Sequence, residues 1–536
     1  MIHFPKTVFQ KIKSNWEVIV LITLITTIGV FRSLFWEDIV LNIDELEWSY
    51  LLNRVKENPI PFRGFEAHTS GPISIYFLSI INLFTNYPTL KAIRIFQYIF
   101  IIIPTCLIVY KAGNFKTRIF SSTFFFLYLT SILPTLLTPG RSNDDFLAYN
   151  NEYQLMLFIG IIYFLQQKLN PSYSQITIVI IFIWLLLFIK SQSLIFVLYF
   201  LLKYLYDLYK FNSKSVSLFI IVNSLIIIVI CTLLISFDLF RDFYFEYIVK
   251  NFLYSFNSIV ESNSFSLSKF YTFTLFLISD LGINWFLFLA ALLFFIIKSY
   301  KNLFLKLNER NLRDSTLLFL VTLITLFLSK NYSSHYKVLL FLPSSLLFGE
   351  LSGIFFEQKF KTFIALLFFF VFGSVLSNLT SINRYDLAFI NPYRNFKKNG
   401  IIPVNYTLKT DDINGKNDTK FLINYALNKY RKGDHIYIFG WFAAQGYYYE
   451  LLKKYKTSSR SSNTYHLNLF KYQDDTKNYK KEEQNLIYDL NLNKPKIIID
   501  TEKFLTTNKK ESLVKFILNN YSLTISSPNY SIWELK

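Results

Sequence analysis

The chain has 536 residues, of which 52% are hydrophobic and 19% aromatic, whereas only 17% are charged. This composition excludes a disordered chain and an ordinary soluble enzyme, and it indicates a membrane protein with several spans. The net charge of +19 could come from nucleic-acid binding, but no basic patch belongs to a recognition module. An excess of basic residues in cytoplasmic loops explains the charge better.

The first long apolar segment, residues 18–35, follows a basic N-terminal stretch. Such a start resembles that of a signal peptide, but no small-residue cleavage site follows the segment. We therefore expect an uncleaved span with a cytoplasmic N-terminus.

Two adjacent carboxylates, Asp44 and Glu45, lie just beyond this segment, in the sequence NIDELEW. A span needs no acid where it leaves the bilayer, so the pair indicates chemistry at the membrane surface. Neighbouring side chains on a helix point about 100° apart, so we expect one carboxylate to face a cavity while the other braces the loop. A capping box of Asp44 with Glu47 is the structural alternative, although it leaves Glu45 unexplained.

Basic clusters at residues 111–118, 203–214, 298–313 and 359–361 flank apolar stretches, and the positive-inside rule places them in the cytoplasm. The external connections are then 37–90, 139–152, 239–272, 329–337 and a tight turn near Lys190. This arrangement gives about 11 spans and leaves the C-terminal region outside. It also requires the apolar stretch 72–85, which is short for a crossing, to be an interfacial helix.

From about residue 378 the apolar residues give way to Lys, Asn, Asp, Ser and Tyr. The pattern predicts helices at 421–431 and 447–454 and buried strands at 435–439 and 496–500, with a turn at 432–434. We expect an extracytoplasmic α/β domain at 381–536, after a transmembrane domain at 1–380. The domain contains no phosphate-binding glycine motif, so no nucleotide site is predicted.

A second acidic group consists of Asp144, Asp145 and Glu152, in an external loop that leads into a later span. Glu152 is expected to face the same cavity as Asp44, and the alternative is a solvated loop with a helix-starting acid. Lys190 interrupts an apolar stretch and is a candidate partner for such an acid, unless its ammonium group snorkels to the membrane surface.

Further external candidates could bind a lipid phosphate, because negative charge grows on a phosphate as its substituent departs. These residues are Arg63, His68, Arg141, Lys190, His335 and Tyr336. A zinc site is not predicted, because the histidines lack ligand spacing. Cys106 and Cys231 each lie within apolar runs and are expected to be small buried residues.

These motifs resemble the GT-C superfamily of membrane glycosyltransferases. The resemblance rests on the acidic pair and on HTSGP at 68–72, YNNE at 149–152, KSQ at 190–192, YFEY at 244–247 and HY at 335–336. More narrowly, the chain is similar to the bacterial enzymes related to protein O-mannosyltransferases and to the aminoarabinose lipid A transferases. The stretch 433–441 looks like the start of the external domain found in some members.

The resemblance implies inverting sugar transfer from a polyprenyl-phosphate donor to an extracytoplasmic lipid, glycan or protein acceptor, in the bacterial cytoplasmic membrane. An acid of the first external loop acts in the family as the base or as a metal ligand, and we assign this role to Asp44, supported by Glu45. A divalent metal ion, if one is used, would be held by Asp44 and Glu152. The sequence TSGP replaces the commoner Lys-Pro-Pro-type run, so phosphate contacts would come from Arg63, His68 or Lys190.

Two other functions remain open at this point. A glycan polymerase or ligase uses similar lipid donors, and a large external loop rich in Arg would favour it. A flippase or transporter would be favoured by repeat symmetry and paired broken helices, and the sequence has neither pattern. Membrane lipids, the lipid-linked donor and the acceptor are the expected partners, and nucleic acid is not.

Overall fold

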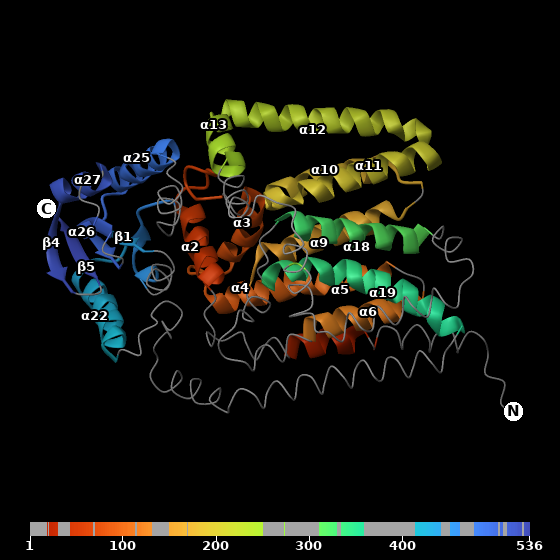
Figure 1. The fold of residues 1–536 in the computed structure, drawn as a ribbon, viewed down its shortest axis with the longest axis horizontal. Coiled ribbons are helices and arrows are strands. Elements are labelled where there is room, and N and C mark those ends of the chain that lie inside the picture. The colour runs from red at the N-terminus through yellow and green to blue at the C-terminus, as the bar shows by residue number, and fades with distance from the viewer. Residues whose placement is uncertain are drawn as a thin grey trace. The chain divides into compact units, whose positions relative to one another are not determined.

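In the computed structural model the described residues are 19, 21–30, 43–67, 70–112, 115–130, 149–168, 170–249, 273, 310–329, 334–358, 413–440, 451–460, 476–501, 504–507, 512–527 and 530–536. The chain forms two compact units (Figure 1). One comprises Met1–Glu37, Thr69–Ser74 and Arg94–Asn391, and the other comprises Asp38–His68, Ile75–Ile93 and Pro392–Lys536. Most of the predicted first external loop therefore belongs with the C-terminal segment.

The first unit is helical. Its longer helices are α5 (Ile103–Lys111), α6 (Phe115–Thr130), α9 (Asn151–Gln166), α10 (Tyr173–Ile189), α11 (Leu194–Phe211), α12 (Val216–Ser236), α18 (Arg310–Ser329) and α19 (Val338–Gln358). Short elements join or extend them: η2 (Tyr98–Ile102), η3 (Ser191–Ser193), η4 (Ser213–Ser215), α13 (Phe240–Asp242), η5 (Phe243–Val249) and η6 (Ser334–Lys337). Two helices, α3 (Pro72–Ser79) and α4 (Leu90–Gln97), have residues in both units.

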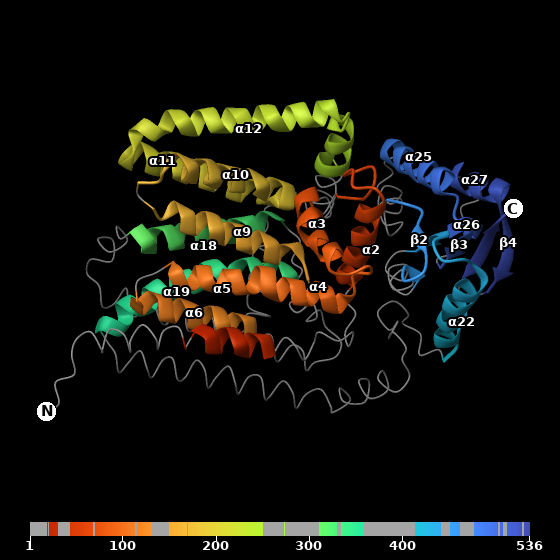
Figure 2. The same cartoon turned by 180° about the vertical axis from the view of Figure 1, so that it is seen from behind.

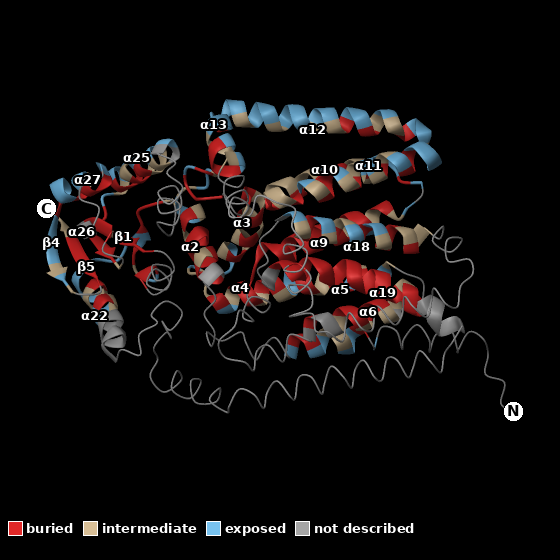
Figure 3. Cartoon of the chain, viewed as in Figure 1, coloured by how far each residue is buried: buried red, intermediate tan, exposed pale blue. Residues whose placement is uncertain are grey.

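The helices of this unit pack side by side. Helix α19 packs against α6, α18 and α9, and α10 packs against α9, α11 and α12; α19 lies beside α6 in both views (Figure 1 and Figure 2). Most of α9 is buried, whereas α12 exposes most of its apolar side chains (Figure 3). An apolar helix with an exposed apolar surface is typical of contact with lipid.

Three described stretches are long and apolar enough to cross a membrane, namely Leu90–Lys111, Ser213–Ser236 and Arg310–Leu328. Shorter apolar helices are Leu21–Val30, Pro72–Leu83, Tyr173–Ile189 and Val338–Ser352. These helices fit a multi-pass membrane protein, while the count of about 11 spans stays a prediction. The stretch 72–85 forms the eight-residue α3 followed by the four-residue 3₁₀ helix η1 (Ile80–Leu83), and its interfacial position is likewise a prediction.

The cysteines differ in their surroundings. Cys106 is buried, as predicted, but Cys231 is exposed, which corrects the sequence-based expectation. Cys231 lies on α12, whose surroundings are largely open. An apolar run does not distinguish a protein core from a lipid-facing surface, so the sequence could not separate the two positions.

The second unit contains a five-stranded sheet with the order β2-β1-β3-β5-β4. Strand β1 (His435–Phe439) is parallel to β2 (Lys456–Thr457) and β3 (Ile497–Asp500), whereas β5 (Ser531–Leu535) is antiparallel to β3 and β4 (Tyr521–Ser526). The helices are α2 (Ile43–Glu57), α22 (Ile413–Lys429), α25 (Thr476–Asn493), α26 (Phe504–Thr507) and α27 (Ser512–Asn520). Both predicted strands are present.

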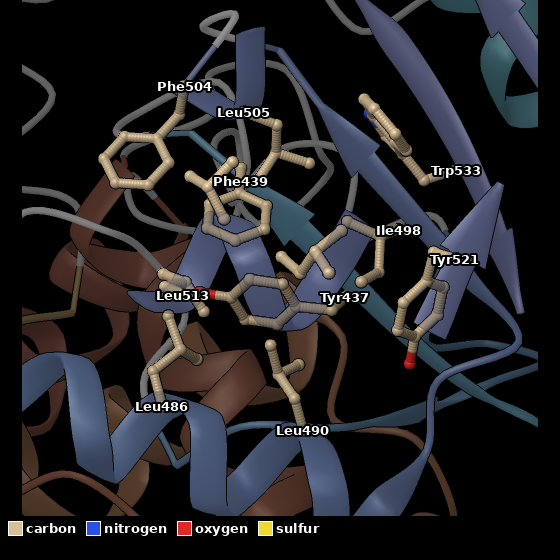
Figure 4. Packing of buried hydrophobic residues seen from close by; sticks show 12 residues of the cluster. Tyr437, Phe439, Leu486, Leu490, Ile498, Phe504, Leu505, Leu513, Tyr521 and Trp533 are labelled. Carbon is tan, nitrogen blue, oxygen red and sulfur yellow. The ribbon is translucent and has the colours of Figure 1, made fainter. Parts of the chain in front are cut away.

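One face of this sheet carries the core shown in Figure 4. Tyr437 and Phe439 of β1, with Ile498 of β3, pack against Leu490 of α25 and Phe504 of α26. The alternate residues of β1 are equally buried on the other face. Burial on both faces explains why the strand is a continuous apolar run in the sequence.

The predicted helices of this unit are found only in part. Helix α22 begins eight residues before the predicted start at residue 421 and ends at Lys429. Of the helix predicted at 447–454, residues 447–450 lie outside the described residues. The domain boundary at 380/381 and the extracytoplasmic side of this region stay predictions.

Candidate functional site

The predicted site residues fall into three groups. Four of them lie outside the described residues: His68, Arg141, Asp144 and Asp145. For Asp44 in α2 and His335 in η6 the structure describes the backbone but not the side chain. In the second unit, Glu45 is fully buried on α2 and Arg63 is exposed. In the helical unit, the structure brings Glu152, Lys190 and Tyr336 together.

A buried ion pair joins Lys190 to the start of α9. The Lys190 ammonium donates to the Glu152 carboxylate and, over 3.3 Å, to the side-chain oxygen of Asn151. Lys190 is 6% exposed and Glu152 is 0% exposed. A charge is costly to bury alone, so each side chain requires the other in this apolar bundle.

Tyr336 completes the surroundings of this cation. The Lys190 ammonium lies 4.2 Å from the centre of the Tyr336 ring, within the range of a cation–π interaction. Tyr336 is buried in η6, immediately before α19. The ammonium therefore meets a carboxylate, an amide oxygen and an aromatic face, contributed by two separate elements.

The backbone leaves helical geometry at Lys190. Helix α10 ends at Ile189, and Lys190 is extended, with φ −157° and ψ 135°. The carbonyl groups that the helix end leaves without intrahelical donors accept bonds from elsewhere. Gly71 N–H donates to Ile189 O over 2.9 Å, Ser74 Oγ donates to the same oxygen over 3.1 Å, and the Tyr247 hydroxyl donates to Leu187 O.

A glycine is required at residue 71, because the main chain there lies directly against the main chain at the end of α10. A Cβ atom at Gly71 would lie 2.0 Å from the Phe188 carbonyl oxygen, which belongs to the main chain and cannot rotate away. The glycine of the HTSGP motif therefore allows the two main chains to lie in contact.

The same segment is also bound to α9. Asn151 Nδ2 donates to Ser70 Oγ over 3.1 Å, and Gln154 Nε2 donates to Ser74 O over 3.0 Å and to the Tyr149 hydroxyl. Motifs far apart in the sequence thus meet at one place. We call this group the Lys190 cluster: Ser70, Gly71, Ser74, Asn151, Glu152, Gln154, Lys190, Tyr247 and Tyr336.

Two charged residues near these motifs were not predicted as site residues. Glu246 of η5 is 4% exposed, and Lys337 of η6 is 0% exposed. Each is a charged residue next to an apolar stretch, and this signal was available in the sequence. Glu246 directly precedes Tyr247, and Lys337 directly follows Tyr336, so both flank members of the Lys190 cluster.

A second ionic group in the helical unit joins α11 to α18. Lys203 Nζ lies 2.8 Å from Asp207 Oδ2 and 3.1 Å from Asp314 Oδ2, while Arg310 Nη2 lies 3.1 Å from Asp207 Oδ2. Arg313 Nη2 contacts Asp314 Oδ1 at 3.2 Å. We call these five residues the Lys203 cluster. Both aspartates are buried.

The described residues do not fit a divalent metal ion. No group of three or more His, Cys, Asp or Glu side chains among them could hold one. Glu152, the described member of the predicted ligand pair, already accepts a hydrogen bond from an ammonium group, and that cation competes with a metal ion for the same carboxylate.

A comparison with protein-family models gives no match, and neither does one with curated proteins. Among solved structures, ArnT from Cupriavidus metallidurans bound to undecaprenyl phosphate is similar, with a TM-score of 0.50 and 10% identity over 97% of this chain and 98% of that chain. Its apo state has the same TM-score at 9% identity, over 97% of this chain and 98% of that chain. The archaeal oligosaccharyltransferase AglB from Archaeoglobus fulgidus has a TM-score of 0.43 and 11% identity, over 98% of this chain and 74% of that chain.

The likeness to ArnT extends over nearly the whole length of both chains. At 10% identity it establishes a shared fold and no more. This shared fold agrees with the fold that the resemblance of the motifs implied.

Proposed function

We propose that this protein is an inverting glycosyltransferase of GT-C type, which moves a sugar from a polyprenyl-phosphate donor to an extracytoplasmic acceptor. The observation that carries the proposal is the buried Lys190 ammonium, held at a break between two apolar helices. The ArnT fold supports it, because the ArnT structure contains undecaprenyl phosphate. Ionisable groups in such bundles are typical of functional sites.

Lys190 would bind the donor phosphate. An ammonium group has three N–H donors, and Glu152 and Asn151 accept from two of them. The third can turn between Tyr336 and a phosphate oxygen. As the bond between the anomeric carbon and the phosphate oxygen breaks, negative charge grows on the phosphate, and a cation in surroundings of low dielectric stabilises it strongly.

Asp44 would act on the acceptor. Its carboxylate takes the proton from the acceptor hydroxyl while that oxygen forms a bond to the anomeric carbon, on the face opposite the leaving phosphate. The polyprenyl phosphate departs with the bonding electron pair, and this single displacement inverts the configuration. Such a base contributes roughly 10²- to 10⁴-fold in rate. Glu45 is fully buried on α2, a position that suits support of the helix better than contact with a substrate.

Asp44→Asn tests this assignment, because the amide retains the volume of the side chain while removing the base. Helix α2 already begins at Ile43, so Asp44 lies within the helix and is not the N-cap of the alternative capping box. The full chain is reconstituted in vesicles with a polyprenyl-phosphate sugar, and the product is detected by mass spectrometry. We expect transfer to fall at least about 10²-fold with normal membrane insertion, and Glu45→Gln to cost less. Wild-type turnover by the Asp44→Asn variant would remove Asp44 from the mechanism.

The same assay separates the other functions. A polymerase or ligase would also cleave the donor but would produce an extended or attached glycan. A flippase would move the donor across the bilayer with the sugar–phosphate bond intact. The sugar and the acceptor would be identified from the glycans and lipids that change in a deletion strain.

A further inference from the structure

Helix α2, which carries Asp44 and Glu45, is bound to the C-terminal sheet of its own unit. Arg54 Nη1 donates to Thr457 through both the main-chain oxygen, at 3.3 Å, and Oγ1, at 3.2 Å. The Tyr50 hydroxyl donates to Ser459 O over 2.6 Å. The bonded residues are more than 400 positions apart in the sequence.

Arg54 joins three segments at one point. Besides Thr457, its guanidinium donates to Gly64 O over 3.0 Å and to Glu57 Oε2 over 2.7 Å. The residue is 5% exposed, so these bonds are shielded from water. A guanidinium is planar and offers donors in fixed directions, whereas an ammonium group cannot reproduce the same set of contacts.

Arg460 forms a second connection, between the sheet region and the loop that follows α2, residues 58–67, which we call the first loop. Its guanidinium makes a two-bond contact with Asp489 of α25, at 2.8 and 3.0 Å, and donates to Phe62 O over 3.1 Å. Its main-chain oxygen accepts from Glu66 N–H over 3.0 Å. The first loop is therefore bound through side chains and main chain alike.

These contacts occupy the edge of the sheet. Strand β2 pairs with β1 and ends the strand order. The carbonyl groups of Thr457 in β2 and of Ser459 after it accept from side chains of α2, and that of Arg460 accepts from the first loop. An edge strand normally needs cover, and here the first loop helps to provide it.

We propose that Arg54 and Arg460 are positioning residues, through which the C-terminal sheet holds α2 in the orientation that Asp44 needs. The inference rests on the proposed role of Asp44. Arg54 is ten residues after Asp44, about 15 Å along the helix axis. A helix moves as a rod, so a shift at Arg54 displaces Asp44, and a misplacement of about 1 Å can cost about 10² in rate.

Kinetics of the reconstituted full chain provide the first test. Arg54→Met is expected to lower kcat about 30-fold with an unchanged KM for the donor, because Lys190 of the helical unit binds the donor phosphate. Arg54→Lys should recover only part of kcat, since an ammonium group lacks the planar set of donors of a guanidinium. The matched control is Lys429→Met, which removes a 2.5 Å ion pair with Glu534 elsewhere in the same unit and should leave both constants unchanged. An equal loss in the control, or none in Arg54→Met, would overturn the inference.

Hydrogen exchange of residues 45–57 provides a test that needs no substrate. In the full chain in lipid nanodiscs, Arg54→Met should speed exchange of α2 at least about tenfold, and Lys429→Met should not. If Arg54→Met fails to insert, Tyr50→Phe removes the single bond to Ser459 and should give a smaller increase. Unchanged exchange in these variants would overturn the inference. Changed exchange in a chain without transferase activity would refute the proposed function while leaving the attachment of α2 intact.

Discussion

The Lys190 and Lys203 clusters both bury charge among the helices of one unit, yet they differ in backbone. Helix α9 connects them, since Glu152 is in its first turn and its last residue, Gln166, accepts a bond from Arg310 Nη2 over 2.8 Å. The separation along the helix is 14 residues, about 21 Å. The Lys203 cluster comes from regular α-helices, with Lys203–Asp207 and Arg310–Asp314 each four residues apart.

At the Lys190 cluster most contributing segments depart from the α-helix. Lys190 is extended, Tyr247 lies in a π-helix, and Tyr336 lies in a 3₁₀ turn. Non-helical backbone within an apolar bundle is tolerated only where it is buried in protein or lines a cavity, because its polar groups need partners. A buried ion pair therefore does not identify a site by itself. A buried ion pair on irregular backbone is the stronger indication, and the Lys203 cluster is interpreted as a connection between helices.

Replacing the lysine of each cluster should have different consequences: loss of both activity and stability at Lys190, and loss of stability alone at Lys203. Lys190→Met should lower kcat/KM for the donor at least about 10²-fold and should destabilise the fold by about 3–5 kcal/mol, because Glu152 is left as an uncompensated buried charge. Adding Glu152→Gln should restore much of the unfolding temperature in detergent but none of the activity.

Lys203→Met is the matched control. It should lower the unfolding temperature, because two buried aspartates lose a shared cation, while the surviving protein keeps normal kinetic constants. Recovery of activity in the Lys190→Met, Glu152→Gln variant would show that the Lys190 cluster is as structural as the other.

A second test concerns the close approach at Gly71. Gly71→Ala should reduce transfer about tenfold, because its Cβ would displace the main chain next to Lys190. Gly160→Ala is the control, since its new Cβ would be 3.3 Å from the flexible side chain of Leu342. Initial rates at fixed donor would measure both variants. Equal rates for the two would show that the irregular backbone at Lys190 tolerates movement.

The smallest effect is expected at an exposed ion pair of the sheet unit. Partial burial would raise the pKa of Glu534, but hydrogen bonds from Lys429 and Tyr425 outweigh it and lower this pKa to about 2. A lowered carboxyl pKa contributes stability above the unfolded value of about 4.3, and that stability is lost as the pH falls toward 2.

Because this pair is partly exposed to solvent, its contribution should not exceed about 1 kcal/mol. Glu534→Gln should therefore reduce slightly the loss of thermal stability that the wild type shows between pH 5 and pH 3. A steeper loss in the variant would contradict the sign of this linkage. The comparison also gives the scale of an ordinary ion pair, against which the Lys190 pair can be measured.

The sequence predicted what depends on local pattern. An uninterrupted apolar run gave β1, and a single lysine within an apolar stretch identified Lys190 as a partner for Glu152. The roles of Asp44 and of the donor-binding residues stay predictions. From the sequence, Lys203, Arg310 and Arg313 were interpreted only as markers of cytoplasmic loops. In the structure they form ion pairs with Asp207 and Asp314.

Contacts that depend on how the two ends of the chain meet could not be predicted from the sequence. The bonds of Arg54 and Arg460 to segments about 400 residues away depend on how the sheet folds onto the first loop. The need for glycine at residue 71 depends on the position of the Phe188 carbonyl oxygen. The early start of α22 was missed because a polar helix surface has little apolar periodicity.

The function proposed above depends on binding of a lipid phosphate by the Lys190 cluster. Its most direct test is equilibrium binding of a polyprenyl phosphate to the purified full chain in nanodiscs, with the wild type, Lys190→Met, Lys190→Arg and Lys203→Met compared. We expect Lys190→Met to weaken binding at least about tenfold, Lys190→Arg to weaken it less, and Lys203→Met to bind like the wild type. Wild-type binding by Lys190→Met, or an equal loss in Lys203→Met, would contradict this expectation.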